Sequence, residues 1–221
     1  YPVGTVVAVS TDKACKPVNV MGMTKALQER IFVAANILNA KTRFIGVRYG
    51  NVLASRGSVI PLFHDQIRNG GPVTITVPEM TRFLLSLDRA VDTVFAAIKT
   101  AQPGEIYVPD VAAATVINLA KALIGKRRIK IRNIGIRPGE KLHEVMVSEE
   151  EANHCVKRGE FYAIRSMLPE LAGKRAEPNA LRGEFSSAHR ILDYPHTVAL
   201  LKRHHLMPDD RIKWDDGEFL R

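Results

Sequence analysis

A strand–helix–strand series at the start of the chain limits its fold more than any other feature. A Val-rich run over Val3–Val9 predicts a buried strand, which ends in the polar residues Ser-Thr-Asp. Apolar residues at helical spacing predict a helix over Thr24–Leu38, and Arg43–Val47 is typical of a second short strand. Two strands joined by such a helix form a parallel crossover, so the sequence predicts an α/β domain.

Short apolar runs and helical patterns continue to alternate further along the chain. The sequence predicts helices over 58–68, 88–99 and 115–123, and strands over 73–76, 105–108 and 129–133. The Pro-Gly turn in "IRPGEKLHE" predicts the entry to a charged helix. Beyond residue 169 the pattern weakens into a polar arm, and a terminal helix is expected over His196–His205.

Composition excludes several classes of protein. The chain has 221 residues, 46% hydrophobic and 25% charged, which is typical of a globular protein. The sequence contains no run of about 18 apolar residues, the length that a membrane-spanning helix needs. No signal peptide is visible either. Cys15 and Cys155 lack the spacing of a metal or redox pair, so we expect free thiols in a reducing compartment.

The chain is basic, with a formal net charge of +9. Its densest basic run, "KRRIKIR" at Lys126–Arg132, alternates with isoleucines in the pattern of a half-buried strand. A solvated strand face is therefore favoured over a nucleic-acid site, since no recognition helix, aromatic platform or zinc knuckle accompanies the charge. We expect no nucleic-acid partner and no metal site.

Three adjacent side chains at the end of the first strand could carry chemistry. Ligands of α/β sheets bind beyond the carboxyl ends of the strands, where this chain places Thr11, Asp12 and Lys13. A carboxylic acid and an amine can act as acid and base in removing water from a sugar. Lys25, near the start of the predicted helix, needs a partner because the helix dipole disfavours a cation there. The alternative is a structural strand-end pair and a solvated lysine.

Four motifs in order carry a resemblance to a known family. "STDKA" with "NVMGMTK", "RYGNVLASRGSVIPLF", "MTRF" and "RPGEKLHE" resemble the nucleotide-sugar 4,6-dehydratases of the extended short-chain dehydrogenase/reductase superfamily. Within it, the chain is similar to the polysaccharide biosynthesis group that acts on UDP-N-acetylglucosamine, over residues 5–165. The resemblance implies that NAD, rather than NADP, oxidises C4, water leaves across C5 and C6, and the hydride returns to C6.

The resemblance also implies roles for single residues. Asp12 would protonate the leaving C6 hydroxyl, and Lys13 would be the base that removes the C5 proton. Thr11 would hydrogen-bond the C4 oxygen, and Lys25 would hold the nicotinamide ribose. Further candidates for contact with the cofactor are Ser10 and Tyr49.

Met21 departs from the superfamily pattern, because it stands where the Tyr-x-x-x-Lys motif has its tyrosine. Methionine has no ionisable proton and cannot be the C4 hydroxyl base. A subgroup of these dehydratases is similar in carrying methionine within "NVMG", which implies an active variant. The proton would then pass through Thr11, water, Asp12 or Lys13. A degenerate copy without activity is the alternative.

A second set of residues would bind the nucleotide. Arg82 and Arg137 match arginines that clamp the UDP diphosphate in related enzymes, because a guanidinium fork suits phosphate oxygens; surface ion pairs are the alternative. The other substrate-binding candidates are Asn51, Arg56, Ser58, Val59, Pro61 and Glu140.

The resemblance implies the fold and its division into domains. We expect a partial NAD(P)-binding Rossmann-like parallel sheet whose first half, with the Gly-rich turn, is missing from this sequence, and a smaller sugar-nucleotide-binding α/β domain. Residues 1–50 would belong to the Rossmann part, with segments near 73–110 returning to it. Residues 51–168 would form mainly the substrate domain, and 169–221 a C-terminal extension.

The function expected is that of a lyase, a UDP-N-acetylglucosamine 4,6-dehydratase, although this chain by itself is expected to be inactive. The alternatives are a UDP-hexose 4-epimerase and a non-catalytic sugar-nucleotide-binding module. The adjacent acid and base argue against an epimerase, which needs only C4 chemistry. The resemblance further implies a homo-oligomer in the cytoplasm, associated with a membrane only through a missing N-terminal region.

Overall fold

The computed structural model describes residues 2–39, 41–55, 57–171 and 177–210. By packing, the chain divides into two compact units. Unit 1 comprises 1–50, 87–111 and 144–186, and unit 2 comprises 51–86, 112–143 and 187–221. Residues 144–168, assigned by the sequence to the substrate domain, thus pack in unit 1. The expected C-terminal extension is shared between the two units.

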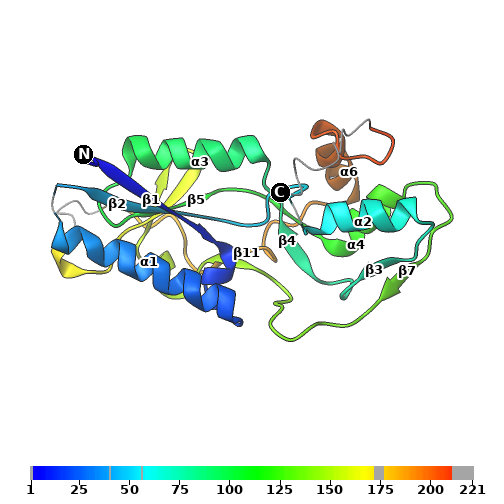
Figure 1. The fold of residues 1–221 in the computed structure, drawn as a ribbon, viewed down its shortest axis with the longest axis horizontal. Helices are drawn as coiled ribbons and strands as arrows, with labels where there is room; N and C mark the ends of the chain where they lie inside the picture. The colour runs from blue at the N-terminus through cyan, green and yellow to red at the C-terminus, as the bar shows by residue number, and fades with distance from the viewer. Residues whose placement is uncertain (1, 40, 56, 172–176, 211–221) are drawn as a thin grey trace. The chain divides into compact units, whose positions relative to one another are not determined.

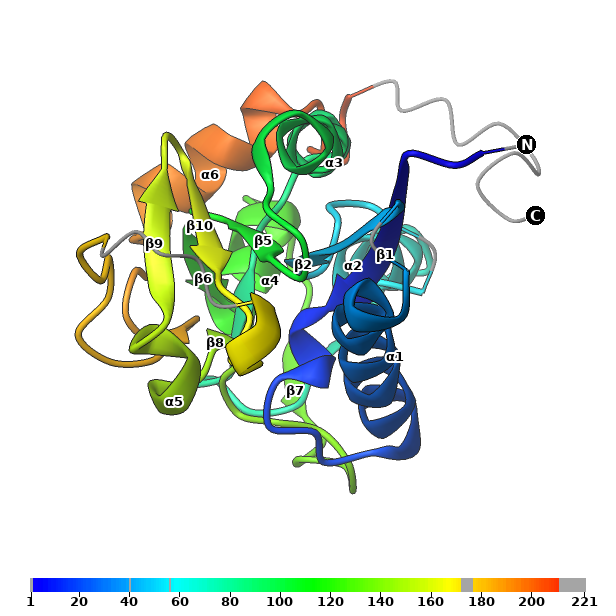
Figure 2. The same ribbon diagram turned by 90° about the vertical axis from the view of Figure 1, so that its left-hand side faces the viewer.

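Unit 1 is built on a five-stranded sheet in the order β1-β2-β5-β10-β9. Strands β1 (Thr5–Thr11), β2 (Arg43–Tyr49) and β5 (Ile106–Pro109) are parallel, as the β-α-β pattern predicts. The hairpin of β9 (Cys155–Arg158) and β10 (Phe161–Ile164) adds two antiparallel strands beside β5 (Figure 2). The α/β class is confirmed, but the sheet is mixed rather than parallel.

Two helices cover opposite faces of this sheet (Figure 1). Helix α1 (Val20–Leu38) packs on β1 and β2, and α3 (Leu87–Thr100) packs on β2 and β5. Helix α1 begins before the expected Thr24 because Asn19 caps it, accepting a 2.8 Å hydrogen bond from the Gly22 amide. Buried apolar residues of β2, α3, β5 and the hairpin form the core of unit 1.

The rest of unit 1 is formed by short elements. The 3-10 helix η1 (Asp12–Ala14) follows β1 directly, and β8 (Val145–Val147) pairs with β11 (Phe185–Ser186). Helix α5 (Glu149–Ala152) carries a capping box between Ser148 and Glu151, and the 3-10 helix η2 spans Pro169–Leu171. The charged helix predicted after "RPGEK" is wrong, because that segment turns and then extends into β8.

Unit 2 encloses its own core between three helices and two strand pairs. Strand β3 (Val73–Ile75) pairs in parallel with β7 (Ile131–Asn133), and β4 (Thr81–Phe83) pairs antiparallel with β6 (Ala113–Thr115). Helices α2 (Val59–Arg68), α4 (Val116–Ile124) and α6 (Tyr194–Arg203) supply most of the buried apolar side chains. Helix α6 begins at Tyr194 because Asp193 caps it, accepting from the His196 amide at 2.9 Å.

Candidate active site

The carboxyl end of β1 places the Thr-Asp-Lys run at the edge where β1 and β2 both end. Thr11, paired in register with Tyr49, caps η1 and accepts a hydrogen bond from the Lys13 amide at 3.4 Å. Its hydroxyl donates to Asp12 Oδ1 at 3.0 Å. The turn of η1 thus brings a hydroxyl, a carboxylate and an amine together at the strand end.

Asp12 and Lys13 are in direct contact. Lys13 Nζ donates to Asp12 Oδ1 at 3.0 Å, and Asp12 is fully buried. The second carboxylate oxygen, Asp12 Oδ2, is buried and has no hydrogen-bond partner within the described part of the chain. A buried polar atom left unsatisfied is costly, so this oxygen marks a place for an incoming polar group.

A further carboxylate, not foreseen from the sequence, completes this cluster. Glu144 Oε1 lies 3.8 Å from Lys13 Nζ, and the Glu144 side chain is 3% exposed. The residue comes immediately before β8, which packs against η1. Its place in the motif "GEKLHE" suggested only a helix, so no local pattern indicated its proximity to Lys13.

Met21 and Lys25 lie in the first turns of α1. Met21 is 47% exposed, and its carbonyl oxygen accepts a hydrogen bond from the Thr24 hydroxyl at 2.9 Å. Lys25 Nζ donates to the Val9 carbonyl at 3.1 Å and to Gln28 Oε1 at 3.0 Å. The ammonium therefore bridges α1 and the last residues of β1, which accounts for a cation near this helix N-terminus.

The two further candidates for cofactor contact, Ser10 and Tyr49, lie in the last residues of β1 and β2. Ser10 is buried, and its hydroxyl makes no hydrogen bond to any residue that the structure describes. Tyr49 is partly buried at the end of β2, and burial raises the pKa of its phenol. Both side chains belong to unit 1, together with Thr11, Asp12, Lys13, Met21 and Lys25.

Unit 1 also contains a buried ion cluster formed by Arg48, Glu29 and Glu151. Arg48 on β2, 2% exposed, donates two hydrogen bonds to the Glu29 carboxylate at 2.9 and 2.6 Å. It donates two more to Glu151 at 2.8 Å and one to the Met146 carbonyl at 2.8 Å. One guanidinium thus connects α1, β2, β8 and α5, and thereby fixes the strand that follows Glu144.

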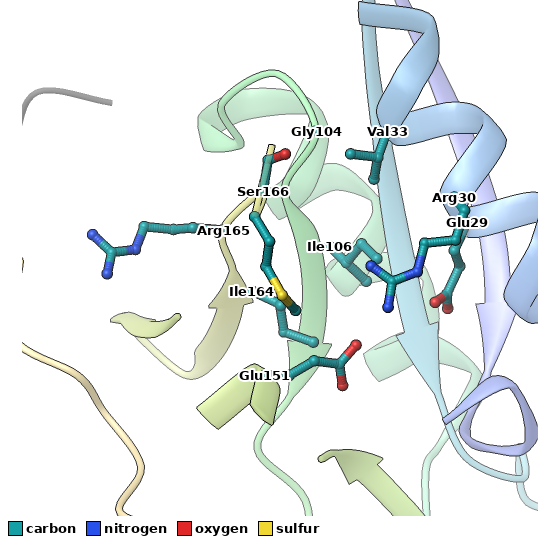
Figure 3. Close-up of a pocket in the computed structure, with 10 residues that line it drawn as sticks. Glu29, Arg30, Val33, Gly104, Ile106, Glu151, Ile164, Arg165 and Ser166 are labelled. Atoms are coloured by element: carbon teal, nitrogen blue, oxygen red, sulfur yellow. The ribbon is translucent and has the colours of Figure 1, made fainter. Parts of the chain in front are cut away.

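The ionisation of Glu151 reflects this cluster. Burial opposes the charged form, but the hydrogen bonds and positive charge of Arg48 outweigh it and lower the pKa of Glu151 to about 2. Figure 3 shows Glu29 of α1 and Glu151 of α5 lining a small cavity with Ile106. At about 20 Å³ this cavity has room for one water molecule but not for a sugar nucleotide.

The predicted nucleotide-binding residues belong to unit 2. Ser58 takes the N-cap position of α2, ahead of Val59 and Pro61, but its side chain makes no capping hydrogen bond and its hydroxyl is buried without a partner among described residues. Asn51 precedes the isolated bridge between Val52 and Leu85. Arg56 lies outside the described residues.

Arg82 and the "RPGEK" segment are held together within unit 2. Arg82 Nη1 donates to the carbonyls of Thr81 and Leu142, at 2.7 and 3.4 Å. Arg137 is exposed, and its backbone amide donates to the Glu140 carboxylate at 3.2 Å. These contacts hold Arg82, on β4, against Leu142, the residue that directly follows the "RPGEK" segment.

A buried hydroxyl relay, not expected from the sequence, supports this arrangement. Thr81 Oγ1 lies 2.8 Å from His143 Nδ1 and 2.6 Å from Ser187 Oγ, and Thr81 and Ser187 are fully buried. The relay connects three segments that are distant in sequence. It fixes the end of the "RPGEKLH" segment against β4. The described candidate residues for catalysis and cofactor contact thus belong to unit 1, and those for nucleotide contact belong to unit 2.

Among the residues that the structure places, no helix is long and apolar enough to cross a membrane. Within the same residues, no group of three or more His, Cys, Asp or Glu side chains is arranged to hold a metal ion.

Curated relatives resemble this chain over long stretches of its sequence. A UDP-glucose 4-epimerase from Rickettsia bellii is 48% identical over 166 residues, 73% of this chain and 49% of the relative. A UDP-N-acetylglucosamine 4,6-dehydratase (inverting) from Campylobacter jejuni is 45% identical over 161 residues, 72% of this chain and 48% of the relative. The chain therefore spans about half the length of these relatives.

Solved structures share the fold. The X-ray structure of Pen from Bacillus thuringiensis has a TM-score of 0.85 at 31% identity, covering 93% of this chain and 64% of that one. A dTDP-glucose 4,6-dehydratase from Bacillus anthracis, in complex with NAD, has a TM-score of 0.54 at 18% identity, covering 61% and 51%. The family model described as polysaccharide biosynthesis protein matches residues 1–166. The chain belongs to this polysaccharide biosynthesis protein family.

Proposed function

We propose that the complete protein, with NAD bound, dehydrates UDP-N-acetylglucosamine to a UDP-4-keto-6-deoxy-N-acetylhexosamine for polysaccharide synthesis. The observation that carries the proposal is the contact between Asp12 and Lys13, an acid and a base 3.0 Å apart at the carboxyl end of β1. Elimination of water needs one group that accepts a carbon-bound proton and another that protonates the leaving oxygen. An adjacent pair supplies both.

In the proposed reaction, Lys13 is the base and Asp12 is the acid. Lys13 Nζ and Asp12 Oδ1 lie 3.0 Å apart, a hydrogen-bond distance across which a proton can be exchanged. With the proton on Asp12, neutral Lys13 removes the C5 proton, the C6–O bond breaks, and Asp12 gives its proton to the departing hydroxyl as water. The Thr11 hydroxyl, already bound to Asp12 Oδ1, can turn to the C4 oxygen of the substrate.

The residues present suit the nicotinamide-ribose end of NAD. The buried Ser10 hydroxyl makes no hydrogen bond to described residues, and the Lys25 ammonium reaches the end of β1. Both can bind hydroxyl or amide groups of a cofactor at the strand ends, where α/β sheets bind ligands. NAD, when bound, supplies the oxidation of C4 and the return of the hydride to C6.

The proposal assigns the diphosphate to unit 2. Arg82 on β4 and Arg137 in the "RPGEK" loop offer planar guanidinium groups that match phosphate oxygens. The contacts of Arg82 with Thr81 and Leu142 support this role, because they hold its guanidinium beside the loop. Asn51 and the start of α2 at Ser58 are the remaining candidates for contact with the nucleotide.

A UDP-hexose 4-epimerase is the second candidate, favoured by the 48% identity to the Rickettsia bellii protein of that name. An epimerase would share the C4 oxidation but would leave C5 and C6 untouched. The Asp12–Lys13 pair supports the dehydratase, because C4 epimerisation has no use for an acid and a base directed at neighbouring carbons.

The test uses the complete gene product with NAD and UDP-N-acetylglucosamine in deuterated water, followed by mass spectrometry and proton NMR. Dehydration predicts loss of one water and deuterium at C5, and the couplings give the C5 configuration. A product of unchanged mass with inverted C4 would establish the epimerase instead. Unchanged substrate in a protein shown to bind both ligands would refute both enzymes and favour a binding module.

A further inference from the structure

Glu144 stands out among the buried charged groups, because no motif assigned it a role and yet it lies beside the proposed base. Its carboxylate is 3.8 Å from Lys13 Nζ, and it is 3% exposed. Buried carboxylates are retained where they are paired with a cation. Lys13, whose side chain is 28% exposed, is a cation that this carboxylate approaches.

The backbone position of Glu144 is fixed by the framework of unit 1. It directly precedes β8, whose Met146 carbonyl accepts a hydrogen bond from the buried Arg48. Strand β8 also pairs with β11 and packs on η1, the short helix that carries Asp12 and Lys13. The backbone that carries the Glu144 side chain is therefore held in place before any substrate arrives.

We propose that Glu144 is a positioning residue that holds the Lys13 amine and stabilises the ammonium formed when Lys13 accepts a proton from the substrate. This inference rests on the proposed dehydratase function for its catalytic consequence. When the C5–H bond breaks, its proton goes to Lys13 Nζ and its electron pair forms the new double bond as the C6 hydroxyl leaves with the proton of Asp12. Lys13 then carries a positive charge between two carboxylates.

Asp12 and Glu144 are carboxylates within ion-pair distance of Lys13, and each can be removed separately. Asp12 faces it from η1 and Glu144 from the residue before β8. Helix α1, which packs on η1, carries Lys25, whose ammonium is bound to the Val9 carbonyl and Gln28. Lys16, beyond η1, is paired with Glu149 and Glu184 at 2.7 Å each. Glu144 is thus a partner of Lys13 that can be replaced without altering the proposed acid–base pair.

The first experiment needs no turnover. Amine acetylation reaches only the neutral form of a lysine, so competitive labelling with acetic anhydride, read by peptide mass spectrometry, reports how firmly Lys13 keeps its proton. In Glu144→Gln we expect Lys13 to label about fivefold faster at the same pH, because one attractive charge is gone. Glu150→Gln, which removes an exposed carboxylate from the same unit, should leave the rate unchanged. Equal Lys13 rates in wild type and Glu144→Gln would overturn the inference.

The second experiment measures the reaction in the complete protein with NAD. Glu144→Gln should lower kcat and the rate of deuterium entry at C5 about tenfold, with KM changed less than about twofold. Glu144→Asp, which keeps the charge, should recover part of the loss. A Glu144→Gln enzyme with normal kcat would contradict the catalytic role. Wild-type protein without water loss would refute the dehydratase, while the labelling result would still decide the Glu144–Lys13 pairing.

Discussion

The Lys13 carbonyl oxygen occupies the space that a Cβ atom at Gly22 would need. Gly22 lies in the first turn of α1, and its amide donates to the capping side chain of Asn19. The Pro17 side chain approaches the same point from the connecting loop, at 3.1 Å. Only a residue without a side chain lets α1 pack this closely on the backbone that presents Asp12 and Lys13.

This close approach predicts that Gly22→Ala is harmful although alanine favours helices. The added methyl group must push η1 and α1 apart, which should cost about 1–3 kcal/mol of unfolding free energy and displace the Lys13 amine. Urea unfolding measures the first effect. Gly183→Ala is the matched control, since nothing lies within 4 Å of its added Cβ. Equal stability of the two variants would contradict the packing argument.

The buried cluster around Arg48 predicts a large effect of a single substitution. Arg48→Met leaves the Glu29 and Glu151 carboxylates buried without their shared cation, which should cost about 3–5 kcal/mol. Arg128→Met makes the same chemical change at an exposed position and should change stability by less than about 0.5 kcal/mol. Chemical denaturation of both variants gives the comparison. A loss below about 1 kcal/mol in Arg48→Met would show that the carboxylates find other partners.

The same cluster predicts a stability that declines in acid. Arg48 outweighs the burial penalty and lowers the pKa of Glu151 from 4.5 to about 2 in the folded protein. A depressed pKa contributes stability that is present above pH 4.5 and is lost as pH falls toward 2, by about 3 kcal/mol.

Denaturant titrations across this pH range measure the loss. Glu151→Gln should flatten it, whereas Glu160→Gln, at a carboxylate 78% exposed, should not. An unchanged acid slope in Glu151→Gln would assign the loss to other carboxylates.

The proposed catalytic roles predict opposite outcomes at Asp12 and Met21. Asp12→Asn should lower kcat of the complete enzyme at least about 100-fold, because the amide cannot give a proton to the leaving hydroxyl. Met21→Leu should keep kcat within about threefold, since Met21 offers only an apolar, half-exposed side chain. Steady-state kinetics on UDP-N-acetylglucosamine test both. A severe loss in Met21→Leu would mean that the thioether itself takes part.

The elements that local pattern predicted well are those with strong periodicity or buried runs. The strands at Val3–Val9 and Arg43–Val47 and the helix at Thr24–Leu38 correspond to β1, β2 and α1. The start of α1 was missed because Asn19, not the first periodic residue, caps the helix. Charge and a Pro-Gly turn suggested a helix after "RPGEK", but pairing of β8 with β11 holds its continuation extended.

The sequence by itself determined the α/β class, the placement of Thr11, Asp12 and Lys13 at a strand end, and the family. Local spacing carries this information, because hydrophobic period and strand-end position depend on neighbouring residues. The contact of Glu144 with Lys13 became apparent only in the folded protein, as did the link that Arg48 makes between Glu29 and Glu151, a residue 103 positions beyond Arg48. Such contacts form because packing removes charged groups from water, and each buried charge then needs a partner of opposite charge. The partner can be distant in sequence, so the pairing produces no periodic pattern of residues.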